Sequence, residues 1–570
     1  MMYPKIKIKW LYGLLCFLFP YTSVMAGKDK GYTEYNHSHL LFLVRMGNVS
    51  QAIKAYECYH KQTGKHDFEF LQEMALLLLD QGYRCSDLNT RLMTLFGAGI
   101  CLNERALYIL KEGISSGIPE LQLISLNFLS QYQNDQADEN LQRALNTKHP
   151  LIRLEAAYLL AQKKSPRAYA YAEALMYRWE GILEEVFPEF FAMIGTPEAL
   201  HMLCKLMCHS HEEVRLAAII NAAKYGCDEL LYKIRTLATH KEKAQQEASA
   251  FALGLLKDET SIPTLKNLSC SNVSHVQLAA WKALYDLGCK EYKILIENAA
   301  KQKDIYAIFL LGELQESQDC LALLINDPNI QVRVNAAMAL LYLQDPRCTK
   351  VLLQDILITH PQDICYSSVC SPGKSLTAWR AAPYAHPDFK DSLYAFERSL
   401  KMREEALVKA LDLPEQDFLQ IAKTLFACQQ NDLIPLLTDL LKKLNTPAAI
   451  ALLQAHQQQI GAPLIRNYCN LALYSLKVKG PYRENLYRWV TNSKKDELLQ
   501  FRPFLPSKLR DLKDNYQLTL EEHSQLMIAS FESLIQNKDE QVVNLLLEAM
   551  QDGNPINRYA LAGLLMRAIH

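Results

Sequence analysis

The densest group of possible metal ligands in this sequence lies in the stretch HMLCKLMCHSH. His201, Cys204 and Cys208 are spaced i, i+3 and i+7, so they share one face of a helix, and His209 and His211 follow in the turn. Imidazole and thiolate are ligands that zinc accepts, so this stretch is a candidate metal site. The simpler interpretation, which we favour, is a helix that uses its cysteines as small apolar residues. We therefore expect no cofactor.

Two short motifs carry the letters of catalytic sites without their context. The stretch GISSG surrounds Ser115 as a nucleophile elbow would, but it follows the helical pattern ERALYILKE, and an elbow needs a preceding strand. Its glycines are better explained as a helix stop. The pair His211 and Glu212 occurs once, whereas di-iron hydroxylases built from helical repeats carry several such pairs. We predict no catalytic residue.

The bulk composition narrows the possible partners. The chain has 570 residues, too many for one compact core, so we expect several domains or an open repeat array. Its 61 basic and 62 acidic residues are balanced, whereas a protein that grips phosphates usually carries a basic excess. We expect a protein partner rather than nucleic acid.

Residues 1–26 have the three parts of a secretory signal peptide. Lys5, Lys7 and Lys9 form a positive head, an apolar run WLYGLLCFLF follows, and small residues precede a cleavage site after Ala26. We expect export to the bacterial periplasm or the cell surface; a eukaryotic secretory route and an uncleaved anchor stay open. No later run approaches 18 apolar residues, so we expect no stable membrane span once the leader is removed.

Fourteen cysteines remain outside the leader. Most lie singly within helical patterns, and we interpret these as packed thiols, because buried cysteine behaves as a small hydrophobe. The best candidate for a disulfide is Cys365 with Cys370, in the stretch CYSSVC. Examples of the packed class are Cys101, Cys204, Cys428 and Cys469.

Similar helices recur along the chain with a period near 31 residues, which is typical of a stacked array of repeats. Five successive intervals are 31 residues long, and the next two are 27 and 29. The best copy is NDPNIQVRVNAAMALLYLQDP. The residues that mark the repeats are Gln122, Arg153, Glu184, Arg215, Gln246, Gln277, Asp304 and Arg333.

Each repeat reads as helix, turn, helix. In residues 195–226, Thr196 is a helix cap, Pro197 opens the first helix, and Gly226 ends the second. The paired alanines of the second helix allow neighbouring helices to approach closely. We expect the arginine near its start, such as Arg215, to lay its stem on the neighbouring repeat and keep its charge in water.

These motifs resemble the HEAT family, in particular the short HEAT-like repeats of phycobilisome lyases. The match is best at DPNIQVRVNAAMALLYLQD, residues 327–345, and extends over residues 80–350. The resemblance implies an all-α fold, an α-solenoid of stacked helical hairpins whose concave face binds another protein. It also keeps a lyase-type enzyme open as an alternative, although no residue set here carries that role.

The chain divides into five segments. Residues 1–26 are the leader, and residues 27–84 form helical hairpins that are either tetratricopeptide-like or irregular HEAT. The HEAT-like array occupies residues 85–358. A loop rich in proline and aromatic residues follows at 359–390, and irregular helical repeats continue the solenoid over 391–570.

The loop at 359–390 is the candidate binding segment. Its prolines forbid a long helix, and its aromatic side chains are costly to leave in water. They either pack back on the solenoid or form a contact patch, since Trp, Tyr and Arg are enriched where partners bind. The candidate residues are Trp379, Arg380, Tyr384, His386 and Phe389.

The sequence therefore predicts an extended pile of short helices, each too apolar on one side to be stable alone. The function we expect is an exported, non-catalytic scaffold that binds a protein on its concave face. The alternative is a HEAT-like enzyme or a metalloprotein centred on residues 201–211.

Overall fold

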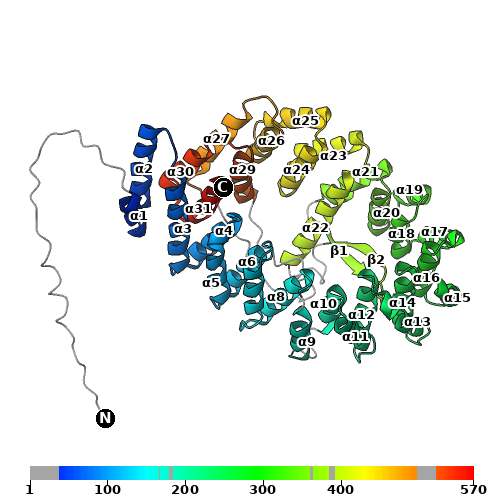
Figure 1. The fold of residues 1–570 in the computed structure, drawn as a ribbon. Helices are drawn as coiled ribbons and strands as arrows, with labels where there is room; N and C mark the ends of the chain where they lie inside the picture. Colours follow the sequence, from blue (N-terminus) through cyan, green and yellow to red (C-terminus); the bar gives the residue numbers. More distant parts are fainter. Residues whose placement is uncertain are drawn as a thin grey trace, which may run out of the picture.

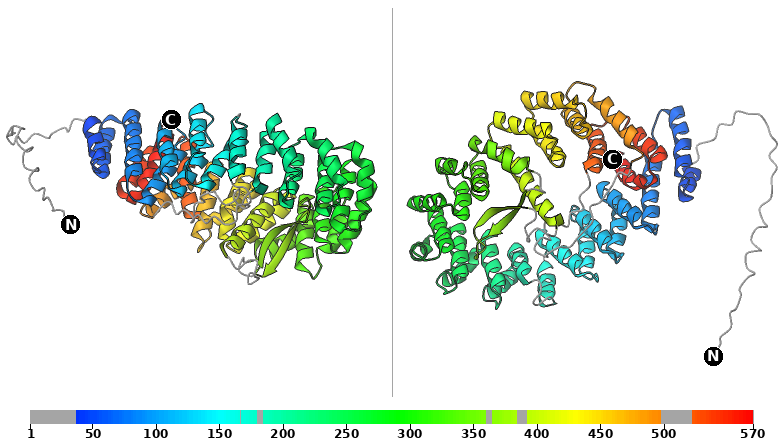
Figure 2. Two further views of the ribbon diagram at one scale, coloured as in Figure 1. Left: turned by 90° about the horizontal axis from the view of Figure 1, so that it is seen from below. Right: turned by 180° about the vertical axis from the view of Figure 1, so that it is seen from behind.

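The protein folds as a continuous series of helical hairpins bent into a ring (Figure 1). The structure is a computed structural model and describes residues 37–165, 167–178, 184–359, 364–383, 392–496 and 522–569. The leader prediction for residues 1–26 lies outside these residues. Views from below and from behind show the same ring, with one β-hairpin inside it (Figure 2).

The helices of the first part are short, and most hairpins add one helix to the outer rim and one to the inner wall. The first helices are α1 (His37–Arg45), α2 (Val49–Thr63), α3 (Phe68–Arg84), α4 (Leu88–Ile100), α5 (Leu107–Ser115), α6 (Pro119–Leu129), α7 (Asp135–Ala144), α8 (Pro150–Gln162) and α9 (Ala168–Arg178). The array continues with α10 (Phe187–Ile194), α11 (Pro197–Leu206), α12 (Glu212–Lys224), α13 (Leu231–Ala238), α14 (Lys243–Leu255), α15 (Ile262–Leu268), α16 (Ser274–Asp286), α17 (Lys293–Lys301), α18 (Ile305–Leu310), α19 (Gln318–Leu324), α20 (Ile330–Tyr342) and α21 (Thr349–Val351).

The second part holds the hairpin and the C-terminal helices. Its elements are β1 (Ile364–Cys370), β2 (Thr377–Pro383), α22 (Ser392–Ala410), α23 (Glu415–Ala427), α24 (Ile434–Leu444), α25 (Pro447–Gln457), α26 (Pro463–Ser475), α27 (Tyr482–Ser493), α29 (Glu522–Gln536), α30 (Val542–Asp552) and α31 (Arg558–Ala568). The all-α class and the helix–turn–helix repeat are confirmed. None of the described helices combines the length and the apolarity that crossing a bilayer requires.

The predicted repeat at residues 195–226 is confirmed in detail. The Thr196 side chain accepts a hydrogen bond from the Ala199 amide, and Pro197 is the first residue of α11. Gly226, with a φ of 69°, ends the second helix in the left-handed region that glycine favours. Thr446 caps α25 in the same way, by accepting from Ala449.

The arginine near the start of an inner helix was expected to keep its charge in water. Instead, its guanidinium is hydrogen-bonded to other groups of the protein. Arg215 Nη1 donates to the carbonyls of His209 and Ser210 at 2.7 and 2.8 Å, and Nη2 pairs with Glu242 at 2.7 Å. Arg333 Nη1 likewise donates to Asp327 and Pro328, both at 2.9 Å. The guanidinium satisfies carbonyls that the preceding helix and turn leave unpaired.

Glutamine performs the same task where it replaces arginine. Gln246 Nε2 donates to the His240 carbonyl at 2.7 Å, and Gln122 Nε2 donates to the Ile114 carbonyl at 2.7 Å. In these four repeats the position therefore holds a long side chain with an N–H donor, and the positive charge is optional. Glu184 and Asp304, which mark two other repeats, provide no such donor.

Small residues set the distance between successive inner helices. A Cβ added to Gly254 of α14 would lie 2.6 Å from the Cα of Ala283 in α16. One added to Gly312 would lie 2.8 Å from the Cα of Ala339 in α20. The backbones are thus in near contact, and any larger side chain would push the repeats apart.

The same contact closes the array on itself. The C-terminal helix α31 packs against α3 and α4 near the N-terminal end, and α30 packs against α2 (Figure 1). A Cβ on Gly563 would lie 2.0 Å from the carbonyl oxygen of Gly97. Arg558 Nη2 donates to Ser50 Oγ at 3.0 Å, and Ser50 donates to the Gln551 carbonyl. The expectation of an open, extended pile is wrong: the two ends meet.

The segment predicted as a loop at 359–390 contains an antiparallel β-hairpin. Strands β1 and β2 pair from Ile364 with Pro383 to Cys370 with Thr377. They pack inside the ring against α18, α20 and α22. The prolines, which exclude a helix, are tolerated here because Pro372 lies in the turn and Pro383 at the end of its strand.

The strand geometry also rules out the predicted disulfide. Cys365 and Cys370 lie five residues apart on β1, so their Cα atoms are separated by about 17 Å and their side chains point to opposite faces. All fourteen cysteines in the described residues are thiols. Cys101 and Cys469 are buried as expected and Cys204 is half-buried, whereas Cys428 is exposed.

Substitution of Arg333 by alanine tests the role of the inner-helix donor. Because the change leaves two turn carbonyls unpaired and breaks the pair with Asp355, we expect a local destabilisation of about 2 kcal/mol. Hydrogen exchange of amides over residues 327–342 measures it. Arg333→Gln, which restores the donor used at Gln246, should cost less than half as much; an equal cost would contradict the assignment.

Substitution of Gly563 by alanine tests ring closure. The added methyl group would overlap the Gly97 carbonyl, so the ends should separate, with a larger radius of gyration in X-ray scattering and faster exchange in α3, α4 and α31. Gly254→Ala introduces a similar overlap within the array and serves as the control. It should destabilise its own repeats and leave the ring closed. An unchanged radius for Gly563→Ala would contradict the closure.

Candidate functional site

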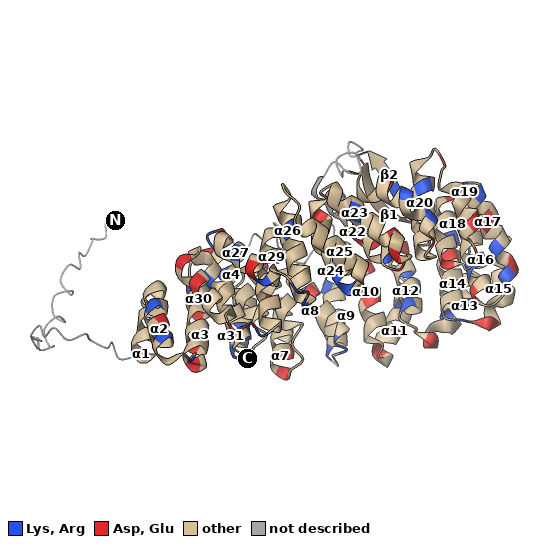
Figure 3. Ribbon diagram, turned by 90° about the horizontal axis from the view of Figure 1, so that it is seen from above, with Lys and Arg blue, Asp and Glu red and all other residues tan. Residues whose placement is uncertain are grey.

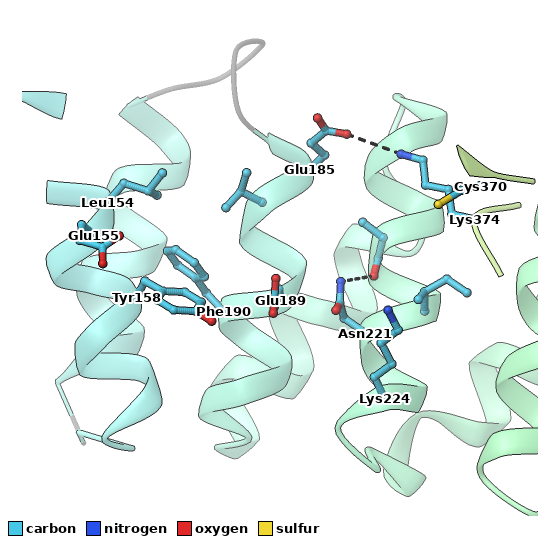
Figure 4. Close-up of a pocket in the computed structure, with 13 residues that line it drawn as sticks. Leu154, Glu155, Tyr158, Glu185, Glu189, Phe190, Asn221, Lys224, Cys370 and Lys374 are labelled. Carbon is cyan, nitrogen blue, oxygen red and sulfur yellow. Dashed lines mark hydrogen bonds and ion pairs between the residues drawn. The ribbon is translucent and has the colours of Figure 1, made fainter. Parts of the chain in front are cut away.

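A cavity of about 380 Å³ opens on the inner wall of the ring, between α8, α10 and α12 (Figure 4). The tip of the β-hairpin completes it by adding Cys370 and Lys374. The rings of Tyr158 and Phe190 lie 5.6 Å apart at a tilt of 49° and form an aromatic wall. The full lining is Leu154, Glu155, Tyr158, Glu185, Val186, Glu189, Phe190, Ala217, Ile220, Asn221, Lys224, Cys370 and Lys374.

The charges around the cavity are separated along its length. Figure 4 places Glu155 beside Tyr158 on the α8 side and Lys224 beside Asn221 on the α12 side. Lys374 Nζ lies 3.6 Å from Glu185 and also contacts Glu213, so its charge is compensated. Elsewhere, Lys and Arg alternate with Asp and Glu along the array, and neither sign forms a continuous stripe in the view of Figure 3.

Glu155 is the unusual member of this set. It has no hydrogen bond or ion pair among the described residues, and burial raises the pKa of its carboxyl from 4.5 to about 7. Glu155 is half-buried, and even partial removal of a carboxylate from water without a partner is costly; the raised pKa expresses that cost. By contrast, Glu189 accepts a hydrogen bond from Tyr225 at 3.0 Å.

The hairpin tip is held in place by a buried acid of α14. The Glu247 side chain is fully buried and accepts a hydrogen bond from the Gly373 amide at 2.8 Å and further ones from the hydroxyls of Ser371 and Ser375. A Cβ on Gly373 would lie 2.6 Å from the Glu247 carboxyl carbon, so this turn requires glycine. Three donors on one carboxylate position Lys374 at the cavity.

The metal ligands predicted around residues 201–211 are not brought together. His201 is exposed, and Cys204 lies 3.2 Å from the Tyr232 hydroxyl. Cys208 is exposed. His211 turns away from this group toward Glu184. The candidate ligands His201, Cys204, Cys208 and His211 therefore do not converge on one point, because the helix face and the turn point to different neighbours.

A different trio of donors does converge at this turn. The ligand atoms of Glu184, His209 and His211 lie within 4.8 Å of one another, with His211 Nδ1 2.8 Å and His209 Nε2 3.7 Å from Glu184 Oε2. However, His209 Nδ1 accepts a hydrogen bond from the His211 amide, so in the neutral ring Nε2 carries the proton. A protonated nitrogen aimed at a carboxylate makes a hydrogen bond and leaves no lone pair for a metal.

The predicted contact patch divides into described and undescribed residues. Trp379 is 9% exposed, and its backbone is clamped by Asn335, which accepts from its N–H at 2.8 Å and donates to its carbonyl at 2.7 Å. Trp379 therefore packs back on the solenoid, and Arg380 is half-buried beside it on β2. Tyr384, His386 and Phe389 lie outside the described residues.

Ser115, the residue with the letters of a catalytic motif, lies at the end of α5. Its hydroxyl donates to the Lys111 carbonyl at 3.2 Å, and Gly117, with a φ of 72°, follows as a helix stop. This confirms the structural interpretation of the stretch GISSG.

The cavity residues were not predicted from the sequence, because they come from three repeats and a hairpin. One signal was present for Glu155. In the repeats marked by Arg215, Gln246 and Gln277, the second residue after the mark is alanine, whereas Arg153 is followed by Glu155. A charged residue at a position otherwise filled by alanine on the inner wall indicates a local role.

These features define the class of protein: an α-solenoid of stacked helical hairpins in which α31 packs against α3 and α4 and whose inner wall carries a cavity. No model of a protein family matches the chain, and no curated protein matches it.

Among solved structures, the similarities are to other helical-repeat proteins. The complex of CpcE and CpcF of phycocyanin lyase from Nostoc sp. PCC7120 is 20% identical over 39% of this chain and 93% of that chain, with a TM-score of 0.28. The karyopherin Kap121p bound to the extreme C-terminus of the phosphatase Cdc14p is 13% identical, with a TM-score of 0.38; the match spans 92% of this chain and 63% of that one. The UNC-45 chaperone is 11% identical over 94% of this chain and 58% of that one, with a TM-score of 0.20. Function therefore has to be argued from this chain's own residues.

Substitution of Glu155 by glutamine should change stability in a pH-dependent way. Since the folded state raises this pKa, the fold favours the protonated acid, and stability is lost as pH rises from about 4.5 to about 7. Glutamine removes that loss. We expect the variant to be more stable than the parent by on the order of 1–3 kcal/mol at pH 8 and nearly equal to it at pH 4.5.

Thermal unfolding at the two pH values measures the effect. The exposed Glu198 on α11 provides the matched control, because Glu198→Gln should shift neither curve. The groups that line the cavity with Glu155 and could titrate are Glu185, Glu189, Lys224, Cys370 and Lys374. A gain in stability that is the same at both pH values would contradict the assignment to the carboxyl charge.

Proposed function

We propose that this chain is an exported, non-catalytic scaffold that binds a segment of another protein against the inner wall of its ring. The observation that carries the proposal is the cavity between α8, α10 and α12. The cavity is already open in the chain alone, so its walls need not be assembled when a ligand binds.

The chemistry of the wall favours binding over catalysis. The groups around the cavity are aromatic faces, acids, an amide and two lysines, with one lysine already paired. Aromatic anchors within a preformed hollow, rimmed by polar groups, are typical of sites that take side chains of a partner. Export remains part of the proposal through the leader sequence at residues 1–26.

Photo-crosslinking at defined positions tests the scaffold function. A benzoylphenylalanine in place of Lys224, on the inner wall, should capture a protein from the native host in good yield. The same residue in place of Lys205, an exposed position of α11 on the outer rim, is the matched control and should capture little of it (Figure 1). Equal capture from both positions, or capture from neither, would overturn the proposal.

Two further measurements examine the remaining parts of the proposal. N-terminal sequencing of protein from the envelope fraction should give a chain that begins after Ala26, whereas an intact leader in the cytosol would contradict export. Elemental analysis should find no stoichiometric zinc or iron. One metal per chain, lost in a Glu184→Gln variant, would favour a metalloprotein at the trio of Glu184, His209 and His211.

A further inference from the structure

Polar side chains are rare on the inner wall at the two positions that follow the residue marking each repeat. Most of these positions hold Leu, Val, Ile or Ala. In the repeats with the alanine-rich pattern, three carry a polar residue there: Glu155 after Arg153, Glu247 after Gln246, and Asn335 after Arg333.

Two of these three polar residues form hydrogen bonds with the β-hairpin of the same chain. Glu247 holds the turn of the β-hairpin through Gly373 and two serines, and Asn335 clamps the backbone of Trp379 on β2. In both cases a polar group on the inner wall exists because a segment inside the ring is bound to it. Both side chains are fully buried, and the polar atoms of both form hydrogen bonds.

Glu155 is the third polar residue, and no group in the described part of the chain forms a hydrogen bond or an ion pair with it. It lines the cavity instead, with Tyr158 one helical turn further along α8 and Phe190 facing it from α10. The hairpin ends at the far side of the cavity, where Lys374 pairs with Glu185 and Glu213. The hairpin thus uses two of these three polar residues and leaves Glu155 to the cavity.

The charges around the cavity determine which kind of chemical group can bind beside Glu155. A neutral apolar group would leave the Glu155 carboxylate without a partner, and an anion would be repelled by Glu155 and Glu189. A cation on a flexible aliphatic stem suits the α8 side of the cavity, away from Lys224 on the α12 side: the charge pairs with the Glu155 carboxylate, while the stem lies against aromatic faces.

We propose that the cavity binds the side chain of a lysine or arginine from the partner protein, with its cation on Glu155 and its stem against the aromatic wall that Tyr158 and Phe190 form together. This inference rests on the proposed function, since it names the chemistry of the segment that the scaffold would hold. The segment would lie inside the ring beside the hairpin and use the same wall of inner helices.

The test uses the full chain and small probes. Nα-acetyl-lysine methylamide and Nα-acetyl-arginine methylamide are titrated at pH 8, and the norleucine analogue, which has the stem without the charge, is the reference. Saturation-transfer NMR should show the two basic probes binding about tenfold more tightly than norleucine or better. Equal affinities for lysine and norleucine would overturn the inference.

Variants locate the binding. Glu155→Gln should weaken the basic probes about tenfold and leave norleucine unchanged, whereas the matched Glu198→Gln on the outer rim should affect none of them. Tyr158→Leu should weaken the basic probes and Tyr158→Phe should restore them, since a phenyl face also attracts a cation. Glu155→Gln removes a charge and keeps the size of the side chain, so we expect the variant to fold. A loss of binding in this variant would therefore not be explained by unfolding. An unchanged affinity in Glu155→Gln would overturn the assignment.

Two more arms separate this inference from the proposed function. Cadaverine, a free diamine, should bind no more tightly than the capped lysine; much tighter binding would assign the cavity to a free amine and overturn the partner side chain. If crosslinking from position 224 captures the same protein equally well in Glu155→Gln, the cation site is wrong and the scaffold stands. If the basic probes bind Glu155 but no protein is captured, the scaffold is wrong.

Discussion

The near contact of backbones between inner helices is the constraint on which the rest of this structure depends. Gly254 against Ala283 and Gly312 against Ala339 bring neighbouring repeats as close as helices can pack, and Gly97 against Gly563 does so between the two ends of the chain. The same kind of contact both stacks neighbouring repeats and joins α31 to α3 and α4. A closed array also resists bending, and a wall that cannot bend keeps a cavity open.

The local part of this architecture could be predicted from the sequence, and the reason is physical. Helix caps, alanine pairs and a donor at the start of each inner helix act within one repeat, so a window of about 31 residues contains all of their causes. Even so, the role of the marking residue was misjudged. Arg215 and Gln246 look chemically different. The structure shows that each donates a hydrogen bond to the equivalent backbone carbonyl in the turn before its helix, which explains why either residue fits this position.

The ring closure, the hairpin and the cavity depend on residues far apart in the sequence. Closure needs Gly97 and Gly563, which no periodicity connects. The hairpin was hidden because its prolines were taken only as barriers to helix formation, although the runs ICYSSVC and TAWRAAP on either side of a Pro-Gly turn are typical of strands. The trio at Glu184 was hidden for a related reason: His209 and His211 were grouped with the helix before them, whereas the acid comes from the previous repeat.

The buried acids show how stability and function separate on the inner wall. Glu247 is as buried as any residue in the chain, yet three donors compensate its charge, so it stabilises the hairpin. Glu155 has no such compensation, and the raised pKa of its carboxyl means that the folded chain is less stable at neutral pH than it would be with a neutral residue there. A scaffold that needed only to fold would place alanine at this position, as the repeats of Arg215 and Gln246 do. An ionisable group that weakens the empty protein is favoured when a ligand of opposite charge completes it, because the same desolvation that makes the carboxylate costly alone makes its pairing strong.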